Sequence, residues 1–230
     1  MTYLFQPDQL ELIMYDLDGT LVDSVPDLAI AIDYMLQDLN LPEAGAEKTR
    51  LWVGNGIPSL VKRALTDDMG GDLPGVVDDA IFQQALTSFK THYDREVGLH
   101  SHLYPGVTDF LQAMTDRGIK QAVVTNKSEF FTEKLLEMMK IDHHFSLSLG
   151  GDSLDEKKPH PMPLLHAIKH FRTTQKTALM IGDSSNDIKA ARAAEVSVIG
   201  LPYGYNHGEP IENANPDLIV STLAELLINV

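Results

Sequence analysis

The chain has 230 residues, of which 43% are hydrophobic and 22% are charged, a composition that is typical of a globular protein and excludes a disordered or fibrous one. Its formal net charge of −15 argues against nucleic acid or an anionic membrane as a partner, because both require a basic surface. The absence of cysteine excludes disulfides, thiolate metal sites and a cysteine nucleophile, so any metal must be held by oxygen or histidine.

The N-terminal segment Met1–Asp8 lacks the basic start and the long apolar stretch of a signal peptide. No apolar run elsewhere approaches the length that is needed to cross a bilayer. We therefore expect a cytoplasmic protein without a membrane partner. A small anionic substrate is compatible with the acidic chain if a cation, a lysine or helix N-termini supply local positive charge.

The first predicted element is a strand over Leu10–Tyr15, an apolar run that ends at Asp16, Asp18 and Gly19. Such a run is typical of a buried parallel strand, and ligands bind at the carboxyl ends of strands in open α/β sheets. Two carboxylates this close repel each other unless a cation lies between them. The pair therefore indicates a metal site, a proton-transfer pair, or both, although a turn rich in Asp is the alternative for this segment alone.

A block of helices is predicted next. Apolar residues three and four apart indicate one helix that ends near Leu41, a second over Pro58–Leu65 and a third over Val76–Tyr93. No convincing strand lies between Val22 and Leu103. The block therefore interrupts whatever sheet the first strand belongs to.

This block divides the chain into two predicted domains. We expect a helical cap domain over residues 23–103, inserted into a catalytic core of residues 1–22 and 104–230. Turns marked by Pro26 at one end and by Pro105 at the other are of the kind that can act as hinges.

Strand-like runs return after the block, and a helical stretch follows each of the first four. These runs are Ile119–Thr125, Phe145–Leu149, Thr177–Ile181, Val196–Leu201 and Leu218–Val220. Strands that alternate with helices indicate an α/β fold with a doubly wound parallel sheet and right-handed crossovers.

Four strand ends of the predicted core carry residues that suit phosphate chemistry. Besides the first acidic pair, Thr125 and Asn126 can donate hydrogen bonds to a phosphoryl oxygen, although a helix cap is the alternative. Lys158 lies in a Pro-rich turn that is either a solvated loop or a means of aiming a charge at an anion. Asp183 follows a later strand, and Asp187, one helical turn further on, either faces the same site or only opens a helix.

In order and placement, these segments resemble the four motifs of the haloacid dehalogenase superfamily. The matching segments are Asp16-Leu17-Asp18-Gly19-Thr20, Thr125-Asn126, Lys158-Pro159, and Gly182-Asp183 through Asp187. The match spans the whole chain, and its order is specific although each short motif is not. The Lys-Pro junction favours Lys158 over its neighbour Lys157. The segment Leu21–Ser24, followed by a helical insert, resembles the branch of the family with a mobile cap after the first motif.

The resemblance implies a Rossmann-like core and Mg²⁺-dependent hydrolysis of a small phosphomonoester. Asp16 would be the nucleophile, would carry an aspartyl-phosphate and would bind the metal. Asp18 would protonate the leaving alcohol and then deprotonate the attacking water, and its backbone carbonyl would be a metal ligand. Asp183 would complete the protein's oxygen ligands, with Asp187 as a further ligand or as an acceptor behind them.

The resemblance also implies that three residues stabilise the charge on the transferring phosphoryl group. They are Thr125, Asn126 and Lys158. Within the insert, Val53–Gly56 and Leu60–Leu65 resemble bacterial phosphoglycolate phosphatases, which implies 2-phosphoglycolate as the substrate, cleaved to glycolate and phosphate.

Recognition of the substrate's carboxylate is expected from the insert. Backbone amides of Gly54, Asn55 and Gly56, at the start of a predicted helix, could bind an anion, and Arg63 or Lys62 could add positive charge. A solvated helix face is the alternative for these two basic side chains.

Other functions stay open. A phosphosugar mutase similar to β-phosphoglucomutase would reuse the same two aspartates, and a phosphatase could instead act on a nucleotide, pyrophosphate or a phosphosugar. A dehalogenase needs no acid/base such as Asp18, and a phosphonatase needs a Schiff-base lysine, for which Lys48 and Lys62 are weak candidates. Two alternatives are not enzymes. A phospho-signalling receiver would have no helical insert after the first strand. An inactive binding module would have lost at least one motif residue, and none is missing here. We expect a monomer or a homodimer.

Overall fold

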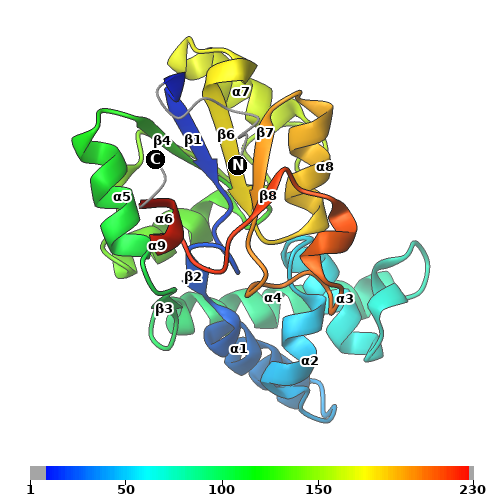
Figure 1. Ribbon diagram of the computed structural model, residues 1–230. Coiled ribbons are helices and arrows are strands. Elements are labelled where there is room, and N and C mark those ends of the chain that lie inside the picture. The colour runs from blue at the N-terminus through cyan, green and yellow to red at the C-terminus, as the bar shows by residue number, and fades with distance from the viewer. Residues whose placement is uncertain (1–8, 228–230) are drawn as a thin grey trace.

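The computed structural model describes residues 9–227, so Met1–Asp8, in which no signal peptide is expected, lies outside the described residues. A six-stranded sheet in the order β5-β4-β1-β6-β7-β8 forms its centre (Figure 1), and all neighbouring strands are parallel. The strands are β1 Leu12–Tyr15, β4 Lys120–Val124, β5 Leu147–Leu149, β6 Ala178–Gly182, β7 Ser197–Gly200 and β8 Leu218–Ile219. The predicted α/β fold with a doubly wound parallel sheet is confirmed.

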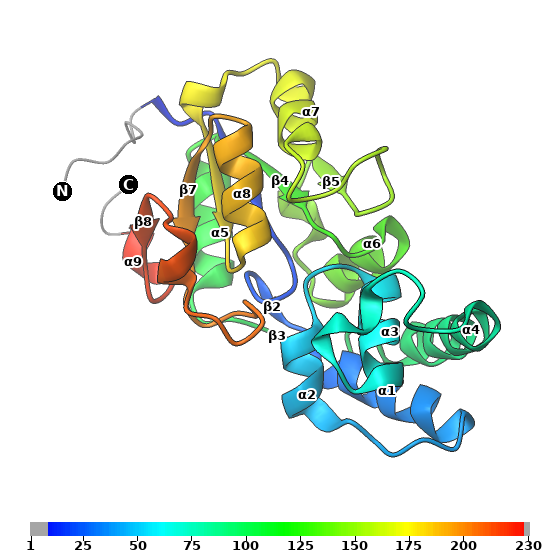
Figure 2. The same ribbon diagram turned by 90° about the vertical axis from the view of Figure 1, so that its right-hand side faces the viewer.

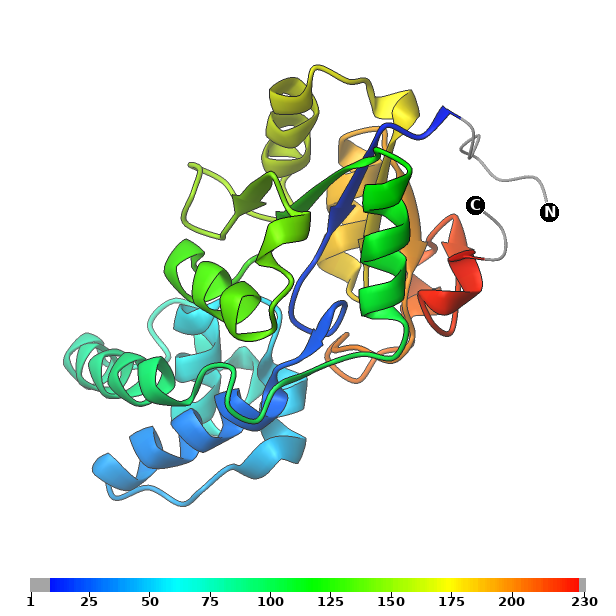
Figure 3. The same ribbon diagram turned by 90° about the vertical axis from the view of Figure 1, so that its left-hand side faces the viewer.

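Each face of the sheet is covered by helices, because alternate side chains of the buried strands point to opposite faces. The helices are α5 Val107–Asp116, α6 Glu129–Met138, α7 Met162–Phe171, α8 Ser185–Ala193 and α9 Ala224–Leu227. The helices on the two faces can be followed in the side views (Figures 2 and 3). Ile13 and Tyr15 of β1 join the hydrophobic core beneath α5, α6 and α9, whereas Leu12 and Met14 join the core beneath α7 and α8.

Short 3₁₀ helices occur between the larger elements. They are η2 Met69–Asp72, η3 Asp142–His144, η4 Gln175–Thr177 and η5 Ile211–Ala214. Within residues 9–227, no helix is both long enough and apolar enough to cross a membrane.

A second group of helices lies against the edge of the sheet where the strands end (Figure 1). It comprises α1 Val25–Asp38, α2 Gly45–Trp52, α3 Ile57–Thr66 and α4 Asp79–Glu96, and we call it the helical layer. Helix α2 was not predicted, because this short helix buries little besides Thr49 and Trp52 and so has no apolar period. Helix α4 begins later than predicted: the Asp78 carboxylate accepts hydrogen bonds from the amides of Ala80 and Ile81 and caps the helix there.

Two segments of the chain connect the helical layer to the rest of the protein, and they lie side by side. Val22–Asp23 (β2) and His102–Leu103 (β3) pair as a two-stranded antiparallel ribbon, an element that the sequence analysis did not predict. The buried carboxylate of Asp27 accepts hydrogen bonds from the amides of Gly98, at 2.8 Å, and His100, at 2.7 Å. The start of α1 is thereby fastened to the segment that leads back to the core.

Candidate active site

Asp16 follows β1 directly and lies at the end of the sheet between two other strands. Its backbone amide donates to the carbonyl of Ile181 in β6, which continues the parallel ladder by one residue. Its Oδ1 atom accepts from the amide of Leu17 at 2.7 Å and lies 3.1 Å from Nζ of Lys158. Burial raises the pKa of Asp16 to about 6, and the nearby Lys158 ammonium opposes that rise.

Three carboxylates converge at this point. Asp16, Asp183 and Asp187 each offer an oxygen, and these oxygens all lie within 4.8 Å of one another. Hard divalent cations prefer such oxygen ligands, and a cation between the carboxylates would offset their mutual repulsion. The donor set therefore fits a metal such as Mg²⁺.

Asp183 is held rigidly in this cluster. The Thr20 hydroxyl donates to one carboxylate oxygen and the amide of Tyr205 donates to the other, both at 2.6 Å. Burial, together with Asp16 and Asp187 nearby, raises the pKa of Asp183 well above its ordinary value. A Cβ atom at Gly204 would lie 2.2 Å from this carboxylate, so only glycine fits there.

Lys158 and Asp187 form a buried ion pair beside Asp16. Nζ of Lys158 donates to Oδ1 of Asp187 at 2.6 Å and also contacts Asp16. Burial alone would lower the pKa of Lys158, but the two carboxylates raise it above its ordinary value and keep the ammonium charged. The other oxygen of Asp187 accepts from the amide and the hydroxyl of Ser184, so Asp187 also caps the start of α8.

Asp18 is outside the three-carboxylate cluster and has different partners. Its carboxylate oxygens lie 3.1 and 3.3 Å from Nζ of Lys127, and the Ser24 hydroxyl donates to one of them at 2.5 Å. Nζ of Lys127 also donates to the hydroxyl of Tyr93 in α4, at 2.6 Å. Lys127 was not predicted from the sequence, although its position directly after Asn126 in the second motif is a signal that could have identified it.

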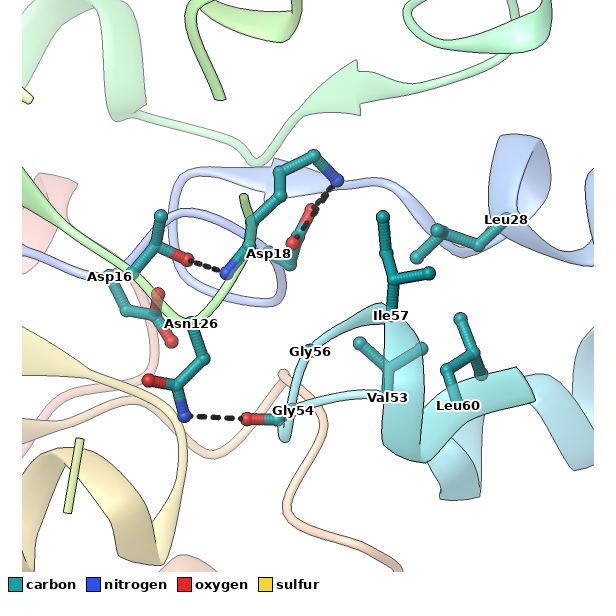
Figure 4. Close-up of a pocket in the computed structure, with 11 residues that line it drawn as sticks. Asp16, Asp18, Leu28, Val53, Gly54, Gly56, Ile57, Leu60 and Asn126 are labelled. Carbon is teal, nitrogen blue, oxygen red and sulfur yellow. Dashed lines mark hydrogen bonds and ion pairs between the residues drawn. The ribbon is translucent and has the colours of Figure 1, made fainter. Parts of the chain in front are cut away.

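Thr125 and Asn126 lie at the same strand end but have different partners. Thr125 lines the cavity beside Asp16. The side-chain amide of Asn126 uses both N–H groups elsewhere, on the carbonyl of Gly54 at 3.0 Å and on that of Lys158 at 2.9 Å. The sequence led us to expect that this amide donates to a phosphoryl oxygen. In this conformation both of its N–H groups are occupied, and the amide instead fastens the helical layer to the core (Figure 4).

The loop before α3 contacts the core mainly through its carbonyl groups. Gly54 also accepts from the Asn186 side chain at 3.3 Å, and the carbonyl of Asn55 accepts from Nζ of Lys157 at 2.7 Å. Gly54 and Gly56 line the cavity, whereas Asn55 does not. The alternative lysine, Lys157, therefore binds this loop, and it is Lys158 that contacts Asp16.

Arg63 is not among the residues that line the cavity. Its side chain is buried within the helical layer, where it donates to the carbonyl of Trp52 at 2.8 Å and pairs with Asp72 at 2.9 Å. Lys62 places its ammonium 4.7 Å from the centre of the Phe82 ring. The cavity-facing side of α3 carries Ile57 and Leu60 instead, so the expected recognition of a carboxylate by Arg63 or Lys62 does not match this geometry.

The cavity between the helical layer and the sheet has a polar and an apolar side (Figure 4). Asp16, Asp18, Thr125, Asn126 and Lys127 form the polar side. Leu28, Val53, Ile57 and Leu60 form the apolar side. Its volume is about 30 Å³, room for about two water molecules. A phosphate ester, whether a nucleotide, a sugar phosphate or a smaller one, cannot be enclosed in this conformation.

Comparison with known proteins gives consistent matches along the chain. Residues 13–201 match the profile of the haloacid dehalogenase-like hydrolase family. A protein of Nitrosococcus oceani named phosphoglycolate phosphatase is 47% identical over 95% of both chains. One of Pseudomonas putida with the same name is 46% identical over 97% of this chain and 81% of its own. The crystal structure of a predicted phosphoglycolate phosphatase from Haemophilus somnus superimposes with a TM-score of 0.90 and 40% identity, over 97% of this chain and 99% of that one.

Proposed function

Because this chain belongs to the haloacid dehalogenase-like hydrolase family, we propose that it is a Mg²⁺-dependent phosphatase that cleaves 2-phosphoglycolate to glycolate and phosphate. The observation that carries the proposal is the convergence of Asp16, Asp183 and Asp187 next to a cavity that Asp16 and Asp18 also line. The names of the relatives supply the substrate, and binding it would require the helical layer to open, because the cavity has room for only about two water molecules.

Two aspartates would divide the chemistry. Oδ1 of Asp16 is engaged by Leu17 and Lys158, which leaves Oδ2 to attack phosphorus. As the new oxygen–phosphorus bond forms, the bond from phosphorus to the glycolate oxygen breaks, and Asp18 gives its proton to that oxygen. Asp18 then takes a proton from water as the water attacks phosphorus, which releases phosphate and regenerates Asp16.

The surrounding residues would balance the charge of the transferring group. Mg²⁺, when bound, supplies positive charge next to the phosphoryl oxygens. Asp16, Asp183 and Asp187 would hold it together with the backbone carbonyl of Asp18. Lys158 contacts Asp16 directly, and Thr125 has a hydroxyl at the cavity wall, so both would stabilise the phosphoryl oxygens during transfer.

The helical layer would act as a mobile cap over residues 23–103, on a core of residues 1–22 and 104–230. Asn126 and Lys157 bind the loop around Gly54 and Asn55 across the boundary, so they would hold the cap closed. Closure would exclude water until the aspartyl-phosphate has formed. A cytoplasmic location and a monomer or homodimer complete the proposal.

The first test is the substrate preference of the wild-type enzyme. We expect kcat/KM for 2-phosphoglycolate to exceed that for ethyl phosphate, glucose 6-phosphate, AMP and pyrophosphate by at least about 100-fold, because a site built to pair a charged group rejects analogues without it. The measurement is phosphate release in excess Mg²⁺. A preference for a sugar phosphate or a nucleotide would contradict the proposal, and interconversion of phosphosugar isomers without phosphate release would favour the mutase.

The second test links the metal to pH. In the unfolded chain, Asp16 and Asp183 titrate at their ordinary values, whereas burial raises both pKa values in the folded, metal-free protein, that of Asp16 to about 6. Folding therefore favours their protonated forms, and their contribution to the free energy of unfolding falls as the pH rises from about 4 through 6. Mg²⁺ binds the ionised carboxylates, so it should raise the melting temperature more at pH 7.5 than at pH 5.

The measurement is thermal denaturation with MgCl₂ and with a chelator at both pH values. Asp183→Asn serves as the control variant, and its melting temperature should respond weakly to Mg²⁺ at either pH. Equal stabilisation of the wild-type protein at pH 5 and pH 7.5 would argue against these carboxylates as the metal site.

A further inference from the structure

The cavity contains one basic side chain among the residues that line it, and this is Lys127. Lys158 lies on the other side of Asp16, where it bridges Asp16 and Asp187, so its charge belongs to the phosphate end of the site. Arg63 is paired with Asp72 inside the helical layer. A second negative charge on a bound substrate therefore has Lys127 as its available partner in the cavity wall.

The ammonium of Lys127 is held by three hydrogen bonds, of which one is long. Within residues 9–227 it donates to the two oxygens of the Asp18 carboxylate, at 3.1 and 3.3 Å, and to the Tyr93 hydroxyl, at 2.6 Å. An ammonium group has three N–H donors, so a ligand anion would take over the donor that makes the 3.3 Å bond, while the 3.1 Å bond still holds Asp18. The side chain is only 3% exposed, so a ligand anion that reached it would pair with a desolvated charge.

The position of Lys127 next to Asp18 sets where such an anion would lie. In the proposed reaction, Asp18 gives its proton to the oxygen that links phosphorus to the rest of the substrate. In 2-phosphoglycolate, one methylene group separates that oxygen from the carboxylate. When the leaving oxygen lies next to Asp18, the substrate carboxylate is therefore also close to Lys127, because Lys127 contacts Asp18.

The side chains of the opposite wall offer no such partner. Leu28, Val53, Ile57 and Leu60 are apolar, and burying a carboxylate against them without a partner would be costly. The loop at Gly54 presents its carbonyl oxygen to two core amides, and a carbonyl oxygen repels an anion. The charge of the cavity thus directs a substrate carboxylate toward Lys127.

We propose that Lys127 recognises the carboxylate of the substrate, so that the enzyme selects phosphate esters of short 2-hydroxy acids. The inference rests on the proposed phosphatase function and goes beyond it, because it assigns selectivity to a residue of the core. Tyr93 is a positioning residue for the ammonium. Since Tyr93 belongs to α4, the ammonium is fully held only when the helical layer is packed on the core.

The test is a change of substrate preference in Lys127→Met, which removes the charge and preserves the length of the side chain. The two substrates are 2-phosphoglycolate and ethyl phosphate, which has the same two-carbon ester without the carboxylate. We expect the ratio of their kcat/KM values to fall by about 30-fold or more, the lower range for loss of one partner of a buried charge pair. Turnover of ethyl phosphate will also decrease, because Asp18 loses a neighbour, and the ratio removes this shared effect.

Lys134→Met is the matched control. Like Lys127, Lys134 lies outside the helical layer and contacts α4. It pairs with the carboxylate of Asp94 at 2.7 Å but does not line the cavity. Its substitution should leave the ratio unchanged. Tyr93→Phe provides a second variant if Lys127→Met does not fold: it should raise KM for 2-phosphoglycolate roughly 2- to 10-fold more than KM for ethyl phosphate.

The outcomes separate the two proposals. An equal loss on both substrates in Lys127→Met would mean that Lys127 only positions Asp18, and it would overturn the inference while the phosphatase proposal stands. An equal rise of both KM values in Tyr93→Phe would overturn the inference in the same way. Wild-type enzyme that does not prefer 2-phosphoglycolate over ethyl phosphate would instead overturn the proposed substrate.

Discussion

Asp16→Asn is expected to abolish phosphatase activity, with kcat reduced by more than about 10⁴-fold, the range seen when the nucleophile of a covalent mechanism is removed. An amide cannot form the aspartyl-phosphate, and it is a poorer ligand for the metal. The fold should persist, because the side chain keeps its size and Lys158 keeps Asp187 as a partner at 2.6 Å. Steady-state kinetics and thermal denaturation of the purified variant measure both effects.

The same chemical change at an exposed position is the control. Asp38 pairs with His92 on the surface of the helical layer, and Asp38→Asn should leave kcat within about twofold of wild type, since exposed ion pairs contribute little. If Asp16→Asn retained activity within tenfold of wild type, Asp16 would not be the nucleophile. Mass spectrometry of rapidly quenched wild-type enzyme should find the phosphoryl group on Asp16.

Asp18→Asn should lower kcat by roughly 10²- to 10⁴-fold through the loss of proton transfer. Mg²⁺ binding should be spared, because the proposed metal ligand at this position is the backbone carbonyl. The loss in the first chemical step should be much smaller with acetyl phosphate, whose leaving group needs no proton. Single-turnover measurements with acetyl phosphate and with 2-phosphoglycolate therefore isolate the acid role of Asp18.

Structural effects of this change should be modest. The side chain stays close in size, and the Ser24 hydroxyl can still donate to its remaining carbonyl oxygen. A variant that lost affinity for Mg²⁺ but turned over normally at saturating metal would refute the acid/base assignment. An equal loss in the first step on both substrates would also count against it.

The elements of the core could be predicted from the sequence because burial on both faces leaves a clear pattern. Leu12–Tyr15 is completely buried, as a near-continuous apolar run between turns implies. The strand ends of a parallel sheet converge at one edge, so Asp16, Thr125 and Asp183 could be placed together from the order of the strands alone. Haloacid dehalogenase family membership, inferred from the same motifs, is confirmed by the profile match over residues 13–201.

The helical layer was less predictable, for a physical reason. Helix α2 has too few apolar residues to show a period, and the β2–β3 ribbon has two residues in each strand, too few to show alternation. The ribbon pairs two segments that are distant in the sequence, and near it the carboxylate of Asp27 accepts hydrogen bonds from the amides of Gly98 and His100. Local sequence contains little information about such contacts.

The sequence by itself determined the sheet, the family and the four motif positions, because each depends on residue type and order along the chain. Only the tertiary structure decided which side chains meet. Arg63 turned out to donate to the carbonyl of Trp52 and to pair with Asp72, and Lys127 was found between Asp18 and Tyr93. A buried charge must have a partner, and that partner is set by how α3, α4 and the strand ends pack together, which no local pattern encodes.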